Sequence, residues 1–155
     1  TQTLRLSQGV YNSYSLSAIG IACHEAGHAI QHAHKYSALS LRSALVPATN
    51  LSTGLAFPAI MLGMFLSIEM FVLIGVVLFS MGVVFALVTL PVEWDASHRA
   101  KTAMVEAGLL SPSEKAGASA VLNAAFLTYL AAALTNILIL VYYLLRLGIL
   151  GGSDD

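Results

Sequence analysis

The sequence predicts an all-α or mainly α integral-membrane protein, with an N-terminal helix, a membrane hairpin, a C-terminal span and a short N-terminal strand. Of its 155 residues, 57% are apolar and 10% are charged, and the mean hydropathy is +0.80. An ordinary soluble domain carries about 25% charged residues, so lipid must cover part of this surface. The stretches 43–68, 70–92 and 116–145 lack charged residues, and each exceeds the ~20 residues that cross a bilayer core.

The region before the first charge-free stretch is more polar. Residues Thr3–Ser7 are predicted to form the short strand, and a turn around Tyr11–Ser13 leads into a helix predicted over about 16–35. The chain starts at Thr1 rather than Met. We therefore expect residues 1–155 to form a single domain that is truncated at its N-terminus, with any N-terminal anchor outside this sequence.

Three membrane spans are predicted, at residues 51–68, 70–90 and 121–145. The first contains Pro58 and follows a loop-like segment at 47–50, so we expect it to be kinked or short. Glu69 is the only charged residue between the first two spans, which must therefore form a tight hairpin. Buried helices of a soluble bundle are the alternative, but charge-free stretches of this length argue against them.

The polar segments 1–46 and 91–118 are predicted to share one membrane face, because the hairpin returns the chain to its starting side. Six of the seven basic residues lie in these segments, and only Arg146 lies at the far end. Because Lys and Arg accumulate in cytoplasmic segments, this face is predicted to be cytoplasmic. The second segment should open a helix at Pro91 that ends near Ala107. A net charge of −1 gives no reason to expect a nucleic-acid partner.

The N-terminal helix carries the motif HExxH, from His24 to His28. Residues four apart lie on one helix face about one turn apart, so the two imidazoles can bind one tetrahedral ion. Glu25 can reach a water on that ion without binding the metal itself, as the general base of an HExxH helix does. Leaving these groups unpaired on a mostly buried helix would be costly. The alternative is that both histidines only hydrogen-bond within a core beside the membrane.

A catalytic zinc site takes a third protein ligand and keeps one position open. Glu93 is predicted to be this ligand, because it follows Pro91 and the hairpin returns it to the depth of the HExxH helix. Asp95 is an alternative, but it lies about 200° round the helix from Glu93, so both should not bind the ion together.

His34 is a second alternative, since it stands six residues after His28 as in the pattern HExxHxxGxxH. That pattern needs a glycine at the turn, where this chain has Gln31, so we expect the helix to continue.

Three more polar side chains lie near these motifs. His32 continues the histidine stripe by one turn and is expected beside the site or at the surface. His98 could stabilise an oxyanion or could be solvated. Arg99 could hold a carboxylate or a phosphate at the membrane interface.

Taken together, these motifs resemble the bacterial membrane neutral zinc metallopeptidases (YugP-like). The similar segments are 24–31 (HEAGHAIQ) with His32, 41–47 (LRSALVP), 89–100 (TLPVEWDASHRA) and 122–134 (LNAAFLTYLAAAL). With the hairpin between them they cover most of the chain from about residue 3 to 146. The resemblance implies a bacterial inner or plasma membrane location.

The wider architecture resembles that of gluzincins in which a membrane hairpin separates HExxH from a Glu in a pattern like E-x-x-A-D. This resemblance gives Glu93 the ligand role and Ala96 the small position. The sequence departs at the next residue, where Ser97 replaces the Asp. Support for a ligand from outside the metal shell is then expected from Asp95, at a different angle.

The implied activity is zinc-dependent hydrolysis of peptide bonds with one catalytic Zn²⁺. Glu25 would take a proton from the attacking water and pass it to the leaving amine. The predicted strand could bind an extended substrate, a peptide or a membrane-associated protein, as an added strand.

Two other functions fit the motif. A non-catalytic membrane protein could use the histidines for metal storage, transport or assembly, and would not need Glu25 for its function. A site-2-type intramembrane protease would need an Asp ligand in a late span, and the last span of this chain contains none.

Overall fold

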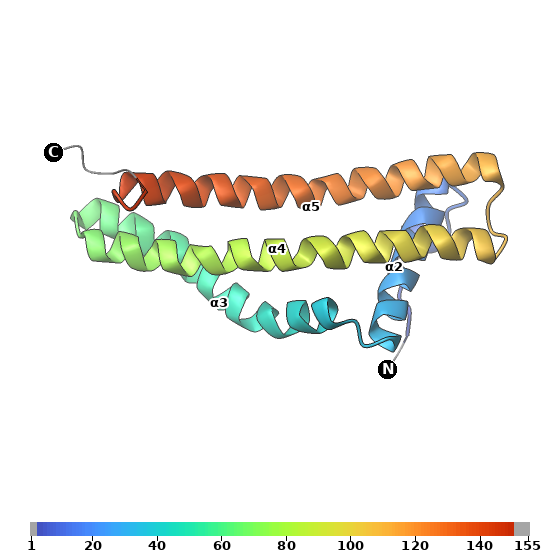
Figure 1. Cartoon of the computed structure of the whole chain (residues 1–155), viewed down its shortest axis with the longest axis horizontal. Coiled ribbons are helices and arrows are strands. Elements are labelled where there is room, and N and C mark those ends of the chain that lie inside the picture. The colour runs from blue at the N-terminus through green and yellow to red at the C-terminus, as the bar shows by residue number, and fades with distance from the viewer. Residues whose placement is uncertain (1–2, 151–155) are drawn as a thin grey trace. The chain divides into compact units, whose positions relative to one another are not determined.

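The computed structural model describes residues 3–150, and the elements in this range are helices (Figure 1). They are α1 (Gln8–Tyr11), α2 (Leu16–Ala33), α3 (Ser37–Leu66), α4 (Glu69–Glu106) and α5 (Pro112–Arg146). The predicted α class is therefore confirmed.

The short strand predicted at Thr3–Ser7 is wrong, because no strand occurs between residues 3 and 150. A strand needs a neighbouring strand to pair its backbone N–H and C=O groups, and helices occupy nearly all of that range. Ser7 instead caps α1, where its side-chain oxygen accepts a hydrogen bond from the N–H of Val10 at 3.4 Å.

Helix α2 closely matches the helix predicted over 16–35. It begins after Ser15, whose side-chain oxygen accepts a hydrogen bond from the N–H of Ala18 at 3.2 Å, as expected of an N-cap. It ends at the C-cap His34, and Lys35 follows with a φ of 51°. A left-handed residue cannot continue an α-helix, so the chain turns there into α3.

Proline breaks neither of the next two helices. We expected a loop at 47–50 and a new helix at Pro91, and both expectations are wrong. Helix α3 runs through Pro47 and Pro58, and α4 runs through Pro91. Each interior proline costs about 3 kcal/mol. In an apolar helix the alternative is a longer stretch of unpaired backbone groups, which lipid penalises more.

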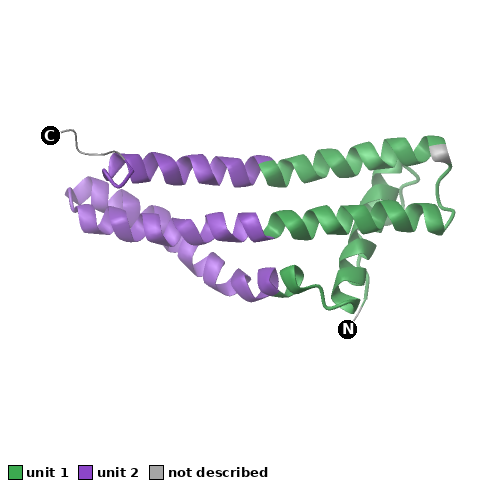
Figure 2. Ribbon diagram, in the orientation of Figure 1, with its two compact units in different colours: residues 1–40, 89–130 green, residues 41–88, 131–155 purple. Residues whose placement is uncertain are grey.

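The chain divides into two compact units, shown in different colours in Figure 2. One comprises residues 41–88 and the described residues from 131 to 150, and it contains the predicted tight hairpin. Ser67 has a φ of 55°, and the N–H of Ile68 donates to the carbonyl oxygen of Gly63 at 2.9 Å. A Cβ on Gly63 would lie 2.6 Å from the backbone nitrogen of Val72, so only glycine allows the two arms to pack this closely.

Three helices are long and apolar enough to cross a membrane, judged over residues 3–150. They are Ser37–Leu66, Glu69–Glu106 and Ser113–Arg146. The predicted spans 70–90 and 121–145 lie inside the second and third of these helices, and the predicted span 51–68 overlaps the first as far as Leu66. Many of their large apolar side chains are exposed, including Phe65 at 86% and Leu51 at 67%. An apolar surface of this kind is suited to lipid.

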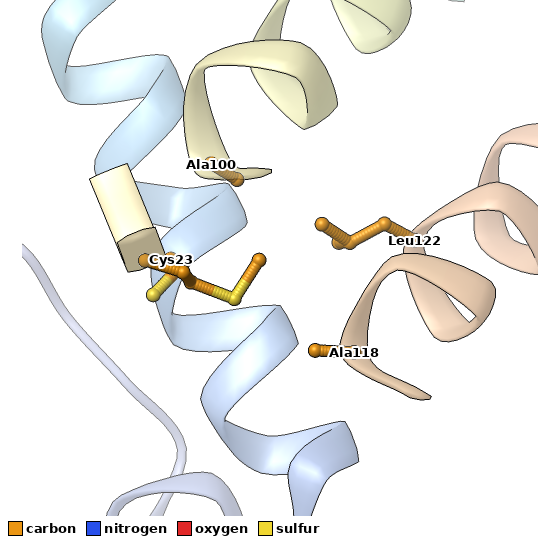
Figure 3. Packing of buried hydrophobic residues seen from close by; sticks show 5 residues of the cluster. Cys23, Ala100, Ala118 and Leu122 are labelled. Atoms are coloured by element: carbon orange, nitrogen blue, oxygen red, sulfur yellow. The ribbon is translucent and has the colours of Figure 1, made fainter. Parts of the chain in front are cut away.

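The other unit comprises the described part of residues 1–40 together with 89–130. Its core joins α2 to α4 and α5, as Figure 3 shows. Cys23 of α2, Ala100 and Met104 of α4, and Ala118 and Leu122 of α5 form this cluster. Burial raises the pKa of the Cys23 thiol, so this cysteine packs as a small apolar side chain and is a poor nucleophile.

Candidate metal centre

Helices α2 and α4 bring His24, His28 and Glu93 together. Glu93 Oε2 lies 3.1 Å from His24 Nε2 and 3.5 Å from His28 Nε2. Candidate ligand atoms of the three residues all lie within 4.8 Å of one another, and these residues could hold a metal ion. Glu93 is 1% exposed, so its carboxylate is directed into the contact between the helices and not into solvent.

The close approach of the two helices depends on one glycine. A Cβ added to Gly27 would overlap the carbonyl oxygen of Ala96. Gly27 lies between the two histidines in sequence, and Ala96 lies one helical turn after Glu93. The small residues therefore set the spacing at the level of the ligands.

The distances fit a zinc ion. In a tetrahedral site with Zn–N and Zn–O bonds of about 2.0–2.1 Å, neighbouring ligand atoms lie about 3.3 Å apart. The separations of Glu93 Oε2 from the two imidazole nitrogens, 3.1 and 3.5 Å, lie on either side of that value. Converging imidazole nitrogens and a carboxylate oxygen place lone pairs against lone pairs unless a proton or a cation lies between them. The residues present therefore suit a divalent ion.

Both histidines have a partner on the ring nitrogen that points away from this position. Ser97 Oγ lies 3.2 Å from His24 Nδ1, and Gln31 Oε1 lies 2.9 Å from His28 Nδ1. Such partners fix the tautomer and ring orientation of metal-binding histidines. Ser97 thus contacts a ligand although it stands where the related pattern has Asp.

Asp95 and His34, the two competing ligands, lie elsewhere. Asp95 Oδ2 accepts hydrogen bonds from Gln31 Nε2 at 2.8 Å and from Arg99 Nε at 2.6 Å. His34 Nδ1 lies 3.2 Å from Arg99 Nη1. Their place in this network favours Glu93 as the third ligand.

In the metal-free protein the pKa of His28 is raised. The main cause is the hydrogen bond between its ring and the Glu93 carboxylate, partly opposed by burial of the ring. Without a metal ion, a proton on His28 can therefore balance the negative charge of the Glu93 carboxylate.

Glu25 faces an open cleft of about 760 Å³ in the same unit. His28 and His32 also line this cleft, and Thr3–Arg5 form part of its wall. The arrangement places a solvent-accessible carboxylate and one candidate metal-binding histidine on a single cavity. The candidate site is therefore open to solvent on the side of Glu25.

The remaining predicted residues surround this centre. His32 is exposed in the cleft, as expected of a residue beside the site, and His98 is exposed on α4. Arg99 holds a carboxylate, one of the two roles expected of it. Gln31, which contacts His28, was not predicted to lie beside this centre, although its position three residues after His28 places it on the same helix face.

Comparisons with known proteins identify the family of this chain. A family model described as "Putative neutral zinc metallopeptidase" matches residues 1–148. The "Putative membrane protease YugP" of Bacillus subtilis (strain 168) is 42% identical over 154 residues, which cover 99% of this chain and 68% of that protein. No solved structure matches the chain. The match to nearly the whole chain, with its HExxH helix and apolar spans, shows that the protein belongs to this neutral zinc metallopeptidase family.

Proposed function

We propose that this chain is a membrane-embedded metallopeptidase that hydrolyses peptide bonds with one zinc ion and with Glu25 as the general base. The observation that carries the proposal is the convergence of His24, His28 and Glu93 beside a cleft that Glu25 also lines. When bound, a zinc ion supplies Lewis-acid chemistry, polarising a carbonyl and making water a better nucleophile at neutral pH.

The residues of the chain have separate tasks in this reaction. His24, His28 and Glu93 would hold the ion, and Ser97 contacts the His24 ring on its other nitrogen. Glu25 accepts a proton from the attacking water and returns it to the amine that leaves when the C–N bond breaks. One water is consumed for each peptide bond cleaved.

The substrate is proposed to be a membrane-associated peptide or protein, processed on the cytoplasmic side of a bacterial membrane. Two features support this placement: the charge-free stretches 70–92 and 116–145, and the basic residues concentrated in 1–46 and 91–118.

The test compares wild-type protein with Glu25→Gln, purified in detergent, by zinc analysis and by cleavage of a quenched-fluorescence peptide library. The variant should keep one zinc per chain and lose turnover about 10²-fold or more, because it lacks the general base. Glu106→Gln, an exposed carboxylate at the end of α4, is the matched control. Equal function of wild type and Glu25→Gln, with zinc bound in both, would favour the non-catalytic metal-binding role instead.

A second comparison tests the ligand set by zinc stoichiometry. Glu93→Ala should lose the ion, whereas His34→Ala and Asp95→Ala should still bind one zinc per chain. Loss of zinc in His34→Ala but not in Glu93→Ala would show that His34, and not Glu93, is the third ligand.

A further inference from the structure

We infer that Gln31 is a positioning residue of the metal centre, whose amide fixes the His28 ring with Nε2 directed at the ion, and that Asp95 fixes the amide. The inference rests on the proposed zinc site. It assigns a role to a side chain that neither binds the metal nor lines the cleft.

Gln31 is fully buried, with an exposed fraction of 0%. Its amide contacts three partners. Oε1 lies 2.9 Å from His28 Nδ1, and Nε2 donates to the backbone oxygen of Val92 and to Asp95 Oδ2, both at 2.8 Å. Burying an amide without partners would destabilise the fold, because its lost hydrogen bonds to water would not be replaced. These contacts explain how a glutamine can be buried at this position.

The two acceptors on α4 determine which way the amide points. A carbonyl oxygen and a carboxylate oxygen can only accept hydrogen bonds, so both need the NH₂ group of Gln31. The reversed amide would place its oxygen against both acceptors and would lose two hydrogen bonds. Oε1 must therefore face His28.

This orientation fixes the tautomer of His28. Because Oε1 can only accept, His28 Nδ1 must carry the hydrogen. In the neutral ring the lone pair is then on Nε2, the nitrogen 3.5 Å from Glu93 Oε2. Gln31 thus directs the one metal-binding atom of His28 toward the other ligands.

Arg99 holds the far end of the network. Its Nε donates to Asp95 Oδ2 at 2.6 Å, the oxygen that also accepts from Gln31. Asp95 is thereby held in place four residues before Arg99 on the same helix. Asp95 and Arg99 can therefore act on His28 through the amide of Gln31.

The experiment measures zinc affinity by competition with a chromophoric chelator on the whole detergent-purified chain. Gln31→Glu keeps the shape but sets a carboxylate against Val92 O and Asp95, while Gln31→Met keeps the bulk without hydrogen bonds. Each should weaken zinc binding about 10- to 100-fold, the usual effect of losing such a partner. Gln8→Glu, in exposed α1, should bind zinc as the wild type does.

Two further readouts separate positioning from folding. The folded fraction of each zinc-free variant is measured by circular dichroism, and the absorption spectrum of the Co²⁺-substituted protein reports the ligand geometry. The Gln31 variants should have weaker affinity per folded chain and an altered Co²⁺ spectrum. If the loss only follows the unfolded fraction, the inference is overturned.

A separate experiment tests whether Asp95 acts through Gln31. Asp95→Ala should weaken zinc binding less than Gln31→Met does, because Val92 O still holds the amide. The double variant should bind no more weakly than Gln31→Met alone, and fully additive losses would show that Asp95 does not act through Gln31.

The results also distinguish this inference from the proposed function. A wild-type chain that binds no zinc would contradict the metal site itself. A wild-type chain that binds zinc, with both Gln31 variants binding it equally well, would leave the site intact and overturn the role of Gln31.

Discussion

Gly27 of α2 lies directly against the backbone carbonyl of Ala96 in α4, and no larger residue fits there. This contact sets how closely the HExxH helix approaches Glu93. Gly27→Ala should therefore push the helices apart, destabilise the fold by about 1–3 kcal/mol as overpacking does, and weaken zinc binding at least tenfold.

The same helix offers a matched control. A Cβ on Gly20 would meet the Ala118 carbonyl oxygen at 3.6 Å, an ordinary van der Waals contact, so Gly20→Ala should leave zinc affinity unchanged. Zinc affinity is measured by chelator competition, and stability by thermal unfolding, for both variants. Equal behaviour of the two variants would show that the Gly27 contact does not control the site.

The raised pKa of His28 predicts opposite pH dependences for the metal-free and zinc-loaded protein. A histidine whose pKa is higher in the folded state stabilises the fold when protonated. That stabilisation is complete below the ordinary pKa of 6.5 and is lost as the pH rises through the raised value. Zinc requires the neutral ring, so zinc affinity should instead fall as the pH drops through the same window.

Melting temperatures of the chelator-treated and zinc-loaded protein across this window would measure both effects. The metal-free Glu93→Ala variant lacks the main cause of the shift, so it should lose most of the pH dependence. A metal-free wild type that becomes more stable with rising pH in this range would contradict the assignment.

Trp94, the single tryptophan of the chain, follows Glu93 and reports the depth of the metal centre. Its side chain is 57% exposed and contacts Phe126 edge to face, with ring centroids 5.1 Å apart. Tryptophan concentrates at membrane–water interfaces. In vesicles, lipids brominated near the headgroup should therefore quench its fluorescence more than lipids brominated deep in the acyl chain.

The double variant Val84→Trp, Trp94→Phe provides a reference for a position deep in the bilayer. Val84 is also exposed and lies about three turns before Trp94 in α4. In this variant, lipids brominated deep in the acyl chain should quench the fluorescence more than lipids brominated near the headgroup. Deep quenching of Trp94 would place the site inside the bilayer and argue for an intramembrane protease.

The segment Thr3–Arg5 lines the cleft without being a strand. If a substrate pairs with its backbone, replacing residues 3–7 one at a time with proline should impair cleavage, because each replacement removes an N–H donor. Zinc content should not change, and alanine at the same positions should preserve activity. Unimpaired cleavage in every proline variant would discard strand addition.

The sequence predicted what depends on local spacing. The four-residue interval between His24 and His28 places them on one helix face whatever the tertiary fold. The long charge-free stretches likewise predicted the apolar helices. Proline was a weaker guide, since α3 and α4 continue through Pro58 and Pro91 where lipid favours unbroken helices.

What depends on contacts between distant segments was harder to predict. Glu93 was expected near the HExxH helix from the hairpin and from the resemblance to gluzincins. The fit of Gly27 against Ala96, which sets the distance, leaves no periodic signal in the sequence. Gln31 was considered as the residue that breaks another motif and as the last residue of the segment HEAGHAIQ, without a role of its own. Its partners Val92 and Asp95 lie more than sixty residues away, so its role became visible only in the packed structure.

His24 and His28 contact different kinds of group, a serine hydroxyl and a glutamine amide, so their rings are held in different ways. The Ser97 hydroxyl can donate or accept a hydrogen bond by rotating, so His24 can exchange tautomers without losing its partner. The amide of Gln31 has no such freedom while Val92 and Asp95 hold it. In the metal-free protein, His24 can therefore keep its contact with Ser97 in either tautomer, whereas the contact with Gln31 holds His28 in a single tautomer.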